Sequence, residues 1–275
     1  AVAFRAGLFN IGVEGQLIIG ALCAAMAGYY INIPWRPAHL FIVMLCAAGG
    51  GALWALIPAL LKVYLNINEV IVTIMMNYIA LNLTNYLIME TPIRVDRSLP
   101  YSHNVLGTAL LPRLEFLSSD TSLNSGFIIA VVLALALAFI FRKTVFGFTV
   151  DAIGENKKAS IFAGFPVKKY IIFTMLLSGA IAGLAGFEQV CGVYKHFVSP
   201  FPEGYGYLGI AVALMAANKP LLIMLTAALF GIFDAGSSYV DIISSVPREI
   251  IYIIEGLLII AVSIRLGRKK EEIHV

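Results

Sequence analysis

The chain has 275 residues, of which 60% are hydrophobic and 13% are charged, and its formal net charge is +3. A typical soluble domain carries about 25% charged residues, so this chain has too few to cover a globular surface in water. The composition argues against a soluble enzyme, a disordered chain and a nucleic-acid partner. It predicts an all-α, polytopic membrane protein with roughly eight spanning helices, because each needs about 20 apolar residues.

Eight apolar segments can be placed along the chain, and two of them are short for a full crossing. The eight segments are 17–31, 38–61, 70–89, 126–141, 170–187, 205–217, 220–240 and 249–264. The short segment 17–31 follows a Gly-rich break at 10–16, and the short segment 205–217 follows a Pro- and Gly-containing stretch at 200–204. Short apolar segments interrupted by Gly or Pro indicate broken helices at a transport site.

The distribution of Lys and Arg predicts the orientation, because basic residues are enriched in cytoplasmic connections. With the C-terminus in the cytoplasm, twelve basic residues fall inside and six outside, and Arg5 is unassigned. The inside residues are Lys62, Arg142, Lys143, Lys157, Lys158, Lys168, Lys169, Lys219, Arg265, Arg268, Lys269 and Lys270. The outside residues are Arg36, Arg94, Arg97, Arg113, Lys195 and Arg248.

Two connections are longer than the others. Residues 91–125 are polar and lie outside in this topology, where we expect a small exposed cap or loop. Residues 142–169 lie inside and contain a helix of about two turns, with Asn156 as its N-cap and Gly164 as its stop signal. Such a helix is too short to be stable alone in water, so it either docks into a partner groove or lies on the lipid surface.

An internal repeat is also possible. When the chain is shifted by 189 positions, residues 14–27 fall on 203–216 with six identities in fourteen. The two segments run in opposite directions in the predicted topology, so the repeat would be inverted. Chance is the alternative explanation, since Ala, Gly and Leu are common in this chain.

Polar side chains gather at the first break, where Asn10, Glu14 and Gln16 lie close together in the sequence. An ionisable residue inside a membrane costs at least about 2.5 kcal/mol at a helix centre, so it usually faces a cavity or a partner. Such a break can form hydrogen bonds to the hydroxyls of a sugar or the edge of a base, because it offers amides, a carboxylate and open backbone groups. The same residues could instead only satisfy the broken backbone.

A second polar cluster is formed by Asn68, Glu69, Thr73 and Asn77, in and just before the segment 70–89. Thr73 and Asn77 are four residues apart and share one face of a helix. This stripe predicts either a pathway lining or hydrogen bonds to a neighbouring helix. For Glu69 the simpler interpretation is a capping box with Asn66.

Four motifs in this order resemble the permeases of ABC importers of the branched-chain amino acid, simple-sugar and nucleoside family. They are FNIGVEGQ at 9–16, NEVI with NYIA at 68–80, DAIGENKKASIFAG with SGAIAGLAG at 151–186, and GIAVALMA with NKP at 209–220. The forms FNIGVEGQ and NEVI point to the nucleoside-type subgroup. The resemblance covers nearly the whole chain.

The resemblance implies one transmembrane permease domain over 1–275, in a plasma (inner) membrane, with further helices expected before the first residue. It implies that 142–169 is a cytoplasmic coupling loop that docks on a separate ATPase subunit. The coupling residues that it implies are Gly154, Glu155, Asn156, Ala159 and Gly164. Further implied partners are a second permease subunit and a substrate-binding lipoprotein, which would contact the extracytoplasmic loop 91–125 and the stretch 192–204.

Two other function classes would require different residues. An ion- or proton-coupled secondary transporter would use Glu14, Glu69, Asp234 or Glu255 for the coupling ion. An intramembrane enzyme would need a catalytic motif, and none is present; the chain also lacks a phosphate-binding G-x-x-x-x-G-K-[ST] loop. The sequence therefore predicts a permease that needs no cofactor and leaves ATP hydrolysis to its partner. Glu188 and Gln189 are interpreted as marking only the outer boundary of 170–187.

Overall fold

A computed structural model describes residues 1–96, 99–114 and 123–243, with side chains as far as residue 236. Within these ranges the chain is helical, with isolated bridges instead of strands. The α-helices are α1 (Val2–Arg5), α2 (Val13–Tyr30), α3 (Arg36–Leu65), α4 (Glu69–Glu90), α5 (Gly126–Lys143), α6 (Val145–Glu155), α7 (Lys157–Phe162), α8 (Val167–Glu188), α9 (Tyr205–Met215) and α10 (Pro220–Ile243). A 3₁₀ turn covers Gly107–Ala109, and a π-helix at Gln189–Tyr194 extends α8.

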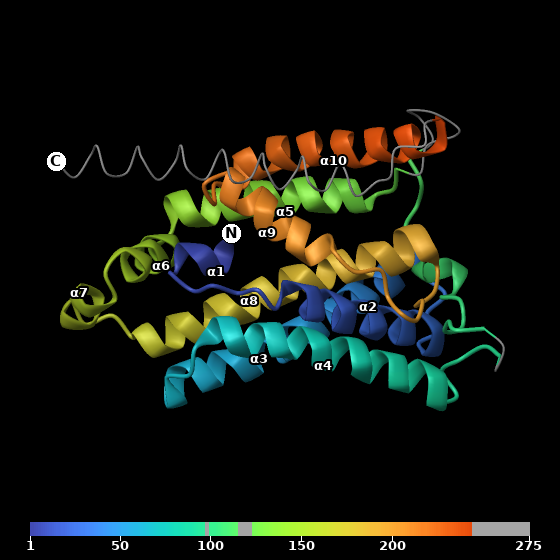
Figure 1. Cartoon of the computed structure of the whole chain (residues 1–275), viewed down its shortest axis with the longest axis horizontal. Helices are drawn as coiled ribbons and strands as arrows, with labels where there is room; N and C mark the ends of the chain where they lie inside the picture. The colour runs from blue at the N-terminus through green and yellow to red at the C-terminus, as the bar shows by residue number, and fades with distance from the viewer. Residues whose placement is uncertain (97–98, 115–122, 244–275) are drawn as a thin grey trace.

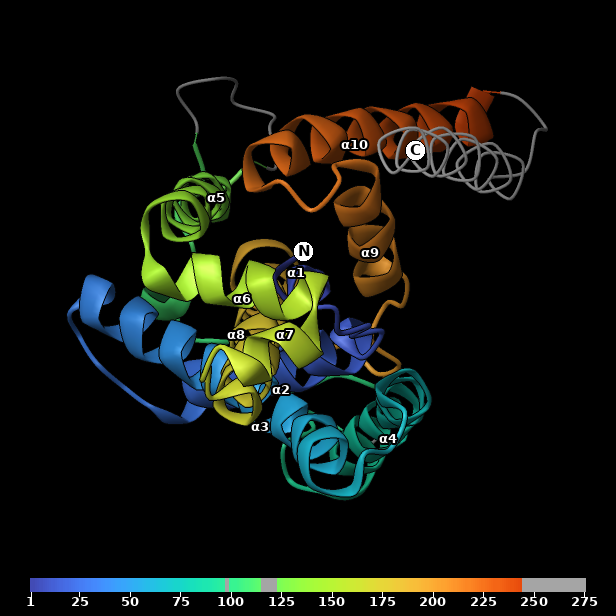
Figure 2. The same ribbon diagram turned by 90° about the vertical axis from the view of Figure 1, so that its left-hand side faces the viewer.

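The centre of the bundle is α8, which packs against α2 and α3 (Figure 1). In the end-on view of Figure 2, α4 covers α2 on one side, while α5 and α10 lie on the other. Much of the surface of α3, α4 and α5 consists of exposed large apolar side chains. Such a surface suits lipid or partner subunits, because contiguous apolar area is unfavourable in water.

Small residues allow α3 and α8 to cross closely. A Cβ atom built on Gly51 would lie 2.2 Å from the carbonyl oxygen of Gly179, and one on Gly183 would lie 2.2 Å from that of Ala47. Neither contact is sterically possible, so glycine is required at both positions. Helices in membranes associate by this close packing of small residues, which explains the glycines of the 178–186 motif as packing residues.

The two long connections lie at opposite ends of the bundle (Figure 1). At one end, residues 101–114 fold over the helix ends: Leu106 N donates to Gly28 O, and Leu111 N donates to Cys191 O. Val105, Ala109 and Leu111 are buried there, so the expected exposed cap is in fact half-buried. At the other end, α6 packs against the bundle and α7 projects from it (Figure 1).

The all-α polytopic fold is confirmed. Within the described residues, seven of the eight expected segments are helices; five helices there are long and apolar enough to cross a membrane, while α9 and the part of α10 up to Gly236 are shorter. The eighth segment, 249–264, lies outside the described residues. One expectation is wrong in detail: α2 begins at Val13 rather than at 17, so the break is confined to the residues before it.

The expected inverted repeat involves α2 and α9. They run in opposite directions and their first turns adjoin (Figure 1), with both bonds of the Glu14 carboxylate made to backbone at the start of α9. This is the arrangement that an inverted repeat requires. The helices differ in length, 18 against 11 residues, and the equivalence of the two segments stays a prediction.

Candidate functional site

The polar residues before and within the first turn of α2 form a buried network. Asn10 and Gln16 exchange two amide hydrogen bonds, of 3.0 and 3.1 Å, and both side chains are 1% exposed. Asn10 Nδ2 also donates to Ser178 Oγ on α8, and Asn10 Oδ1 accepts from Gly12 N. The amides therefore satisfy the irregular backbone before α2 and attach it to the central helix.

Glu14 joins the start of α2 to the start of α9. Its carboxylate is 2% exposed and accepts hydrogen bonds from Gly204 N at 2.8 Å and from Gly206 N at 2.6 Å. The backbone N–H groups at a helix N-terminus have no partners within the helix and favour a negative charge. Glu14 therefore acts as a cap for α9, supplied from a different helix.

Thr73 and Asn77 bond a neighbouring helix, which was one of the two outcomes expected for their stripe. Thr73 Oγ1 accepts from Ile11 N at 3.3 Å. Asn77 Oδ1 accepts from Gly15 N at 2.8 Å, and its Nδ2 donates to Ile11 O at 2.9 Å and to Tyr207 Oη at 3.1 Å. Asn77 thus contacts both broken segments.

The other two residues of the second cluster do not join this network. Asn68 is the N-cap of α4 and accepts from Val70 N at 2.9 Å, while Glu69 pairs with Lys62 at 2.6 Å. The expected capping box of Asn66 with Glu69 is wrong. Asn66 ends α3 with a left-handed φ of 51°, so it is a C-cap rather than an N-cap.

A cavity of about 320 Å³ lies beside the network, which is within the size range of small-molecule sites. Its walls come from α1, the start of α2, α5, α8, α9 and the start of α10, and are mainly apolar. Asn10, Ser178 and Tyr205 are the polar residues of its lining. Of the predicted pathway residues, only Asn10 lines this cavity. Its lining does not include Glu14, Gln16, Thr73 or Asn77.

The loop 142–169 contains two helices where only one was expected. α6 begins at Thr144, whose hydroxyl accepts from Gly147 N, and it packs Val150 and Ile153 into the core. α7 begins at Asn156, whose side chain accepts from Ala159 N at 3.0 Å as expected, and Gly164 follows it with a φ of +81°. The expected N-cap and stop signal are therefore confirmed.

Four of the five predicted coupling residues are exposed at this end, namely Glu155, Asn156, Ala159 and Gly164. Gly154 instead faces its own chain, since a Cβ atom there would lie 2.0 Å from the carbonyl oxygen of Arg5. An ion pair of Arg5 with Asp151 holds the same contact between α1 and α6. The most exposed apolar residue of α7 is Phe162, at 92%.

Ser178 and Tyr207 bond the network, yet sequence reasoning did not select them. Ser178 lies in the small-residue motif of α8, whose glycines pack against α3, and Tyr207 lies in the first turn of α9. Ser178 could have been found from the sequence, because it is a polar residue at the start of the Gly-rich motif 178–186. For Tyr207 the local sequence gives no such signal.

Two of the four acids proposed for an ion-coupled transporter have other partners. Glu14 binds backbone N–H groups, Glu69 binds Lys62, and Glu255 lies outside the described residues. Asp234 lies on α10. In the part of the chain that the structure describes, no group of three or more His, Cys, Asp or Glu could hold a metal ion.

Comparison with known proteins agrees with this architecture. The chain is 40% identical to the guanosine ABC transporter permease protein NupP of Bacillus subtilis, over 96% of this chain and 75% of the relative. It is 33% identical to the nucleoside ABC transporter permease protein NupB of Lactococcus lactis, over 96% and 74%. It is also 32% identical to the glucose ABC transporter permease protein TsgB13 of Haloferax volcanii, over 93% and 69%.

No solved structure matches the chain significantly. A family model does, over residues 1–263, and its description is "Branched-chain amino acid transport system / permease component". This match covers nearly all of the chain and includes every helix described above. The chain therefore belongs to this family and is a multi-pass membrane permease subunit of an ABC transporter.

Proposed function

We propose that this permease moves a nucleoside or a related sugar-containing solute inward by alternating access, driven by ATP hydrolysis on a separate subunit. The proposal is supported by relatives named for guanosine and for nucleosides, which match 96% of the chain. Two permease subunits form the pathway, and this chain itself catalyses no reaction. ATP-driven closure of the ATPase pair moves α7, and the helices rock around the solute.

The observation that carries the coupling step is the exposure of α7. Phe162 is 92% exposed and Ile161 is 56% exposed, on a helix held between α6 and α8. Burying a large apolar side chain is worth about 1.5–3 kcal/mol, so these residues favour a groove on a partner. Glu155, Asn156, Ala159 and Gly164 form the rest of the proposed contact.

The end that carries α6 and α7 is cytoplasmic in this proposal, and so is the C-terminus. The opposite end, with 91–125 and 192–204, then faces outward and receives the substrate-binding lipoprotein. This orientation is supported by the excess of Lys and Arg in the connections at the α7 end. The membrane is the plasma membrane, and its lipids cover the apolar outer surfaces.

The residues of the first break divide into two roles. Asn10 lines the 320 Å³ cavity and contacts the solute together with Ser178. Glu14, Gln16, Thr73 and Asn77 hold the adjoining starts of α2 and α9 in place. Asn68 and Glu69 belong to the turn between α3 and α4 and support the cytoplasmic end of the pathway.

Replacing Phe162 tests the coupling step. We expect Phe162→Ser to abolish both co-purification of the ATPase subunit and ATP-dependent uptake, while the amount of permease in the membrane stays unchanged. Tyr64→Ser is the matched control, because Tyr64 is an exposed aromatic residue at the same end but on α3, at 67% exposure. Normal assembly and uptake of Phe162→Ser would refute the docking of α7.

The solute class is tested by uptake into cells that lack their own nucleoside transport. The full chain is expressed there with its ATPase and substrate-binding partners. We expect labelled guanosine or inosine to accumulate in an ATP-dependent manner, and an excess of glucose or leucine not to compete. Competition by glucose or leucine, without any competition by nucleosides, would contradict the proposed solute.

A further inference from the structure

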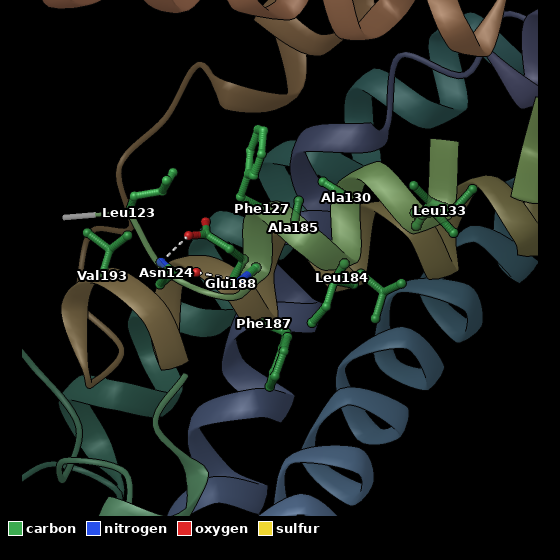
Figure 3. A pocket seen from close by; sticks show the side chains of 13 residues that line it. Leu123, Asn124, Phe127, Ala130, Leu133, Leu184, Ala185, Phe187, Glu188 and Val193 are labelled. Carbon is green, nitrogen blue, oxygen red and sulfur yellow. Dashed lines mark hydrogen bonds between the residues drawn. The ribbon is translucent and has the colours of Figure 1, made fainter. Parts of the chain in front are cut away.

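A second cavity, of about 600 Å³, lies between α5 and the cap end of α8 (Figure 3). Its walls are mostly apolar, with Phe127, Leu133 and Phe187 among them. Asn124 and Glu188 lie next to each other at one end, joined by a hydrogen bond (Figure 3). None of the pathway residues predicted from the sequence lines this cavity.

The larger cavity is continuous in its lining with the 320 Å³ cavity beside Asn10. Four residues line both cavities, Ala130 and Leu133 on α5 and Ile181 and Ala185 on α8. Glu188 lines the larger cavity at its cap end, and Pro220 lines the smaller cavity. If the two cavities form one groove, a solute that enters at the cap end meets Asn124 and Glu188 before it reaches Asn10 and Ser178.

The Glu188 carboxylate has unused hydrogen-bonding capacity. Oε1 accepts from Asn124 Nδ2 and Oε2 accepts from Gln189 Nε2, each at 2.9 Å. A carboxylate offers about four acceptor sites, so among the described residues each oxygen has one acceptor site without a partner. The ion pairs found among the described residues are Arg5–Asp151 and Lys62–Glu69, and neither involves Glu188. A carboxylate that lines an apolar cavity with amide partners alone is typical of a functional position.

We infer that Asn124 and Glu188 form a solute-binding subsite of the transport pathway, which recognises two adjacent hydrogen-bond donors on a neutral ring-containing solute. The donors are either the vicinal hydroxyls of a ribose or the adjacent N–H groups of a guanine edge. Phe127 and Phe187 supply apolar wall for the rest of the molecule. This inference rests on the proposed function, because it names the residues that recognise the transported solute.

A purely architectural role for the same pair makes different predictions. Asn124 Oδ1 accepts from Gly126 N at 2.7 Å and so caps α5, while its Nδ2 reaches Glu188 on α8. The pair could therefore act only as a clamp between two helix ends. Glu188→Gln separates the two roles, because the amide oxygen still accepts from Asn124 whereas the charge and one acceptor oxygen are lost.

The experiment measures the initial rate of uptake, at a solute concentration well below KM, by cells that express the full transporter. We expect Glu188→Gln to lower the rate for guanosine about tenfold, which is the loss expected for one hydrogen bond to a charged group. Membrane level and ATPase co-purification remain normal. Glu90→Gln is the matched control, since Glu90 is an exposed carboxylate at the same end that lies outside the cavity, and its rate stays unchanged.

Four solutes identify which donors are bound: guanosine, inosine and their 2′,3′-dideoxy forms. If the ribose is bound, wild type transports the dideoxy forms more slowly, and Glu188→Gln removes that difference. If the guanine edge is bound, Glu188→Gln slows guanosine but not inosine. Unchanged rates and unchanged selectivity in Glu188→Gln would overturn the subsite while leaving nucleoside transport intact. Wild type that transports no nucleoside would instead refute the proposed function.

A second variant covers the case in which Glu188→Gln is poorly produced. Ala185 is exposed on α8 and lines both cavities, away from the hydrogen bonds of Glu188. We expect Ala185→Phe to block the groove and to reduce guanosine uptake at least tenfold, with normal protein level and normal ATPase co-purification. Wild-type uptake by Ala185→Phe would show that the solute does not pass through this groove and would overturn the inference.

Discussion

Two regions contain residues that are unusual for their surroundings: the start of α2 buries polar side chains, and α7 exposes apolar ones. At the start of α2, the polar side chains of Asn10, Glu14 and Asn77 are buried, and each is bonded to a backbone or side-chain group of the same chain. At α7, the apolar side chains of Ile161 and Phe162 are exposed and the described chain provides no cover for them. The polar groups of the first region are bonded within the chain, whereas the apolar groups of α7 form the surface that we propose docks on the ATPase subunit.

This difference shows where function can be inferred from a single subunit. A buried polar group costs free energy unless it is hydrogen-bonded, so a fully bonded network explains its own presence. An exposed apolar helix is explained only by something that covers it. Substitutions in the first region should therefore reduce stability, whereas substitutions in the second should reduce assembly at constant stability.

The largest effect is expected for Glu14→Ala. The change removes two charge-assisted hydrogen bonds and leaves Gly204 N and Gly206 N without an acceptor. We expect the free energy of unfolding to fall by about 3 kcal/mol or more. Thermal unfolding of the purified protein in detergent measures it.

Glu203→Ala is the matched control for that substitution. Glu203 occupies the corresponding position of the possible repeat but is exposed, so its removal should change the free energy of unfolding by less than about 0.5 kcal/mol. Equal effects at the two positions would contradict the role of Glu14 as the cap of α9.

A smaller loss is expected for Asn77→Ala, which removes the bonds to Gly15 N, Ile11 O and Tyr207 Oη. Part of the loss is offset by relaxation of Tyr207, which is partly exposed, so we expect about 2 kcal/mol. Asn82 lies on the same helix, is exposed, and donates only to Tyr78 O. Asn82→Ala should leave thermal unfolding unchanged, and a loss equal to that of Asn77→Ala would refute the network.

Much of the fold could be predicted because it follows from local sequence. Hydropathy located the helices within a few residues, since a spanning helix must be apolar over most of its length. Asn156 and Gly164 marked the ends of α7 correctly because caps depend on neighbouring backbone. The predicted capping box at Asn66 was wrong, because Asn is favoured both as an N-cap and in the left-handed conformation that ends α3.

The site was harder to predict because its bonds join residues far apart in the sequence. Glu14 was selected as a buried acid, but its partners at 204 and 206 lie about 190 residues later. Glu188 was interpreted as a boundary residue because it ends α8, and only the structure shows that Asn124 lies beside it at one end of a cavity. Sequence reasoning found which residues were unusual, and the structure determined what each one contacts.

In the α7 region, Asn156→Ala should act locally. The Asn156 side chain accepts from Ala159 N, and loss of an N-cap costs about 1 kcal/mol. α7 has six residues and projects from the bundle, so we expect faster proteolysis or amide exchange at 157–162 without a change in global unfolding. Lys158→Ala is the control, since Lys158 is exposed on the same helix and is not a cap. Global destabilisation by Asn156→Ala would contradict the separation of the two regions.

The smallest expected effect is a pH dependence at the cap end, which extends the comparison to a third region. The His196 ring packs against Tyr101 with the centroids 4.8 Å apart, and its Nδ1 lies 3.0 Å from Asn104 Oδ1. Burial lowers the pKa of His196 below its usual value of 6.5, so the folded cap favours the neutral ring.

Above pH 6.5 the His196 ring is neutral in both folded and unfolded chains, and its contribution to stability is complete. As the pH falls below 6.5, the unfolded chain gains a proton first, so the cap loses stability until the folded pKa is passed. The protection of amides 101–105, which is their exchange rate relative to that of an unstructured chain at the same pH, should therefore fall between pH 7.5 and 5.5 in wild type and less so in His196→Gln, whereas an identical loss of protection in both would refute the assignment.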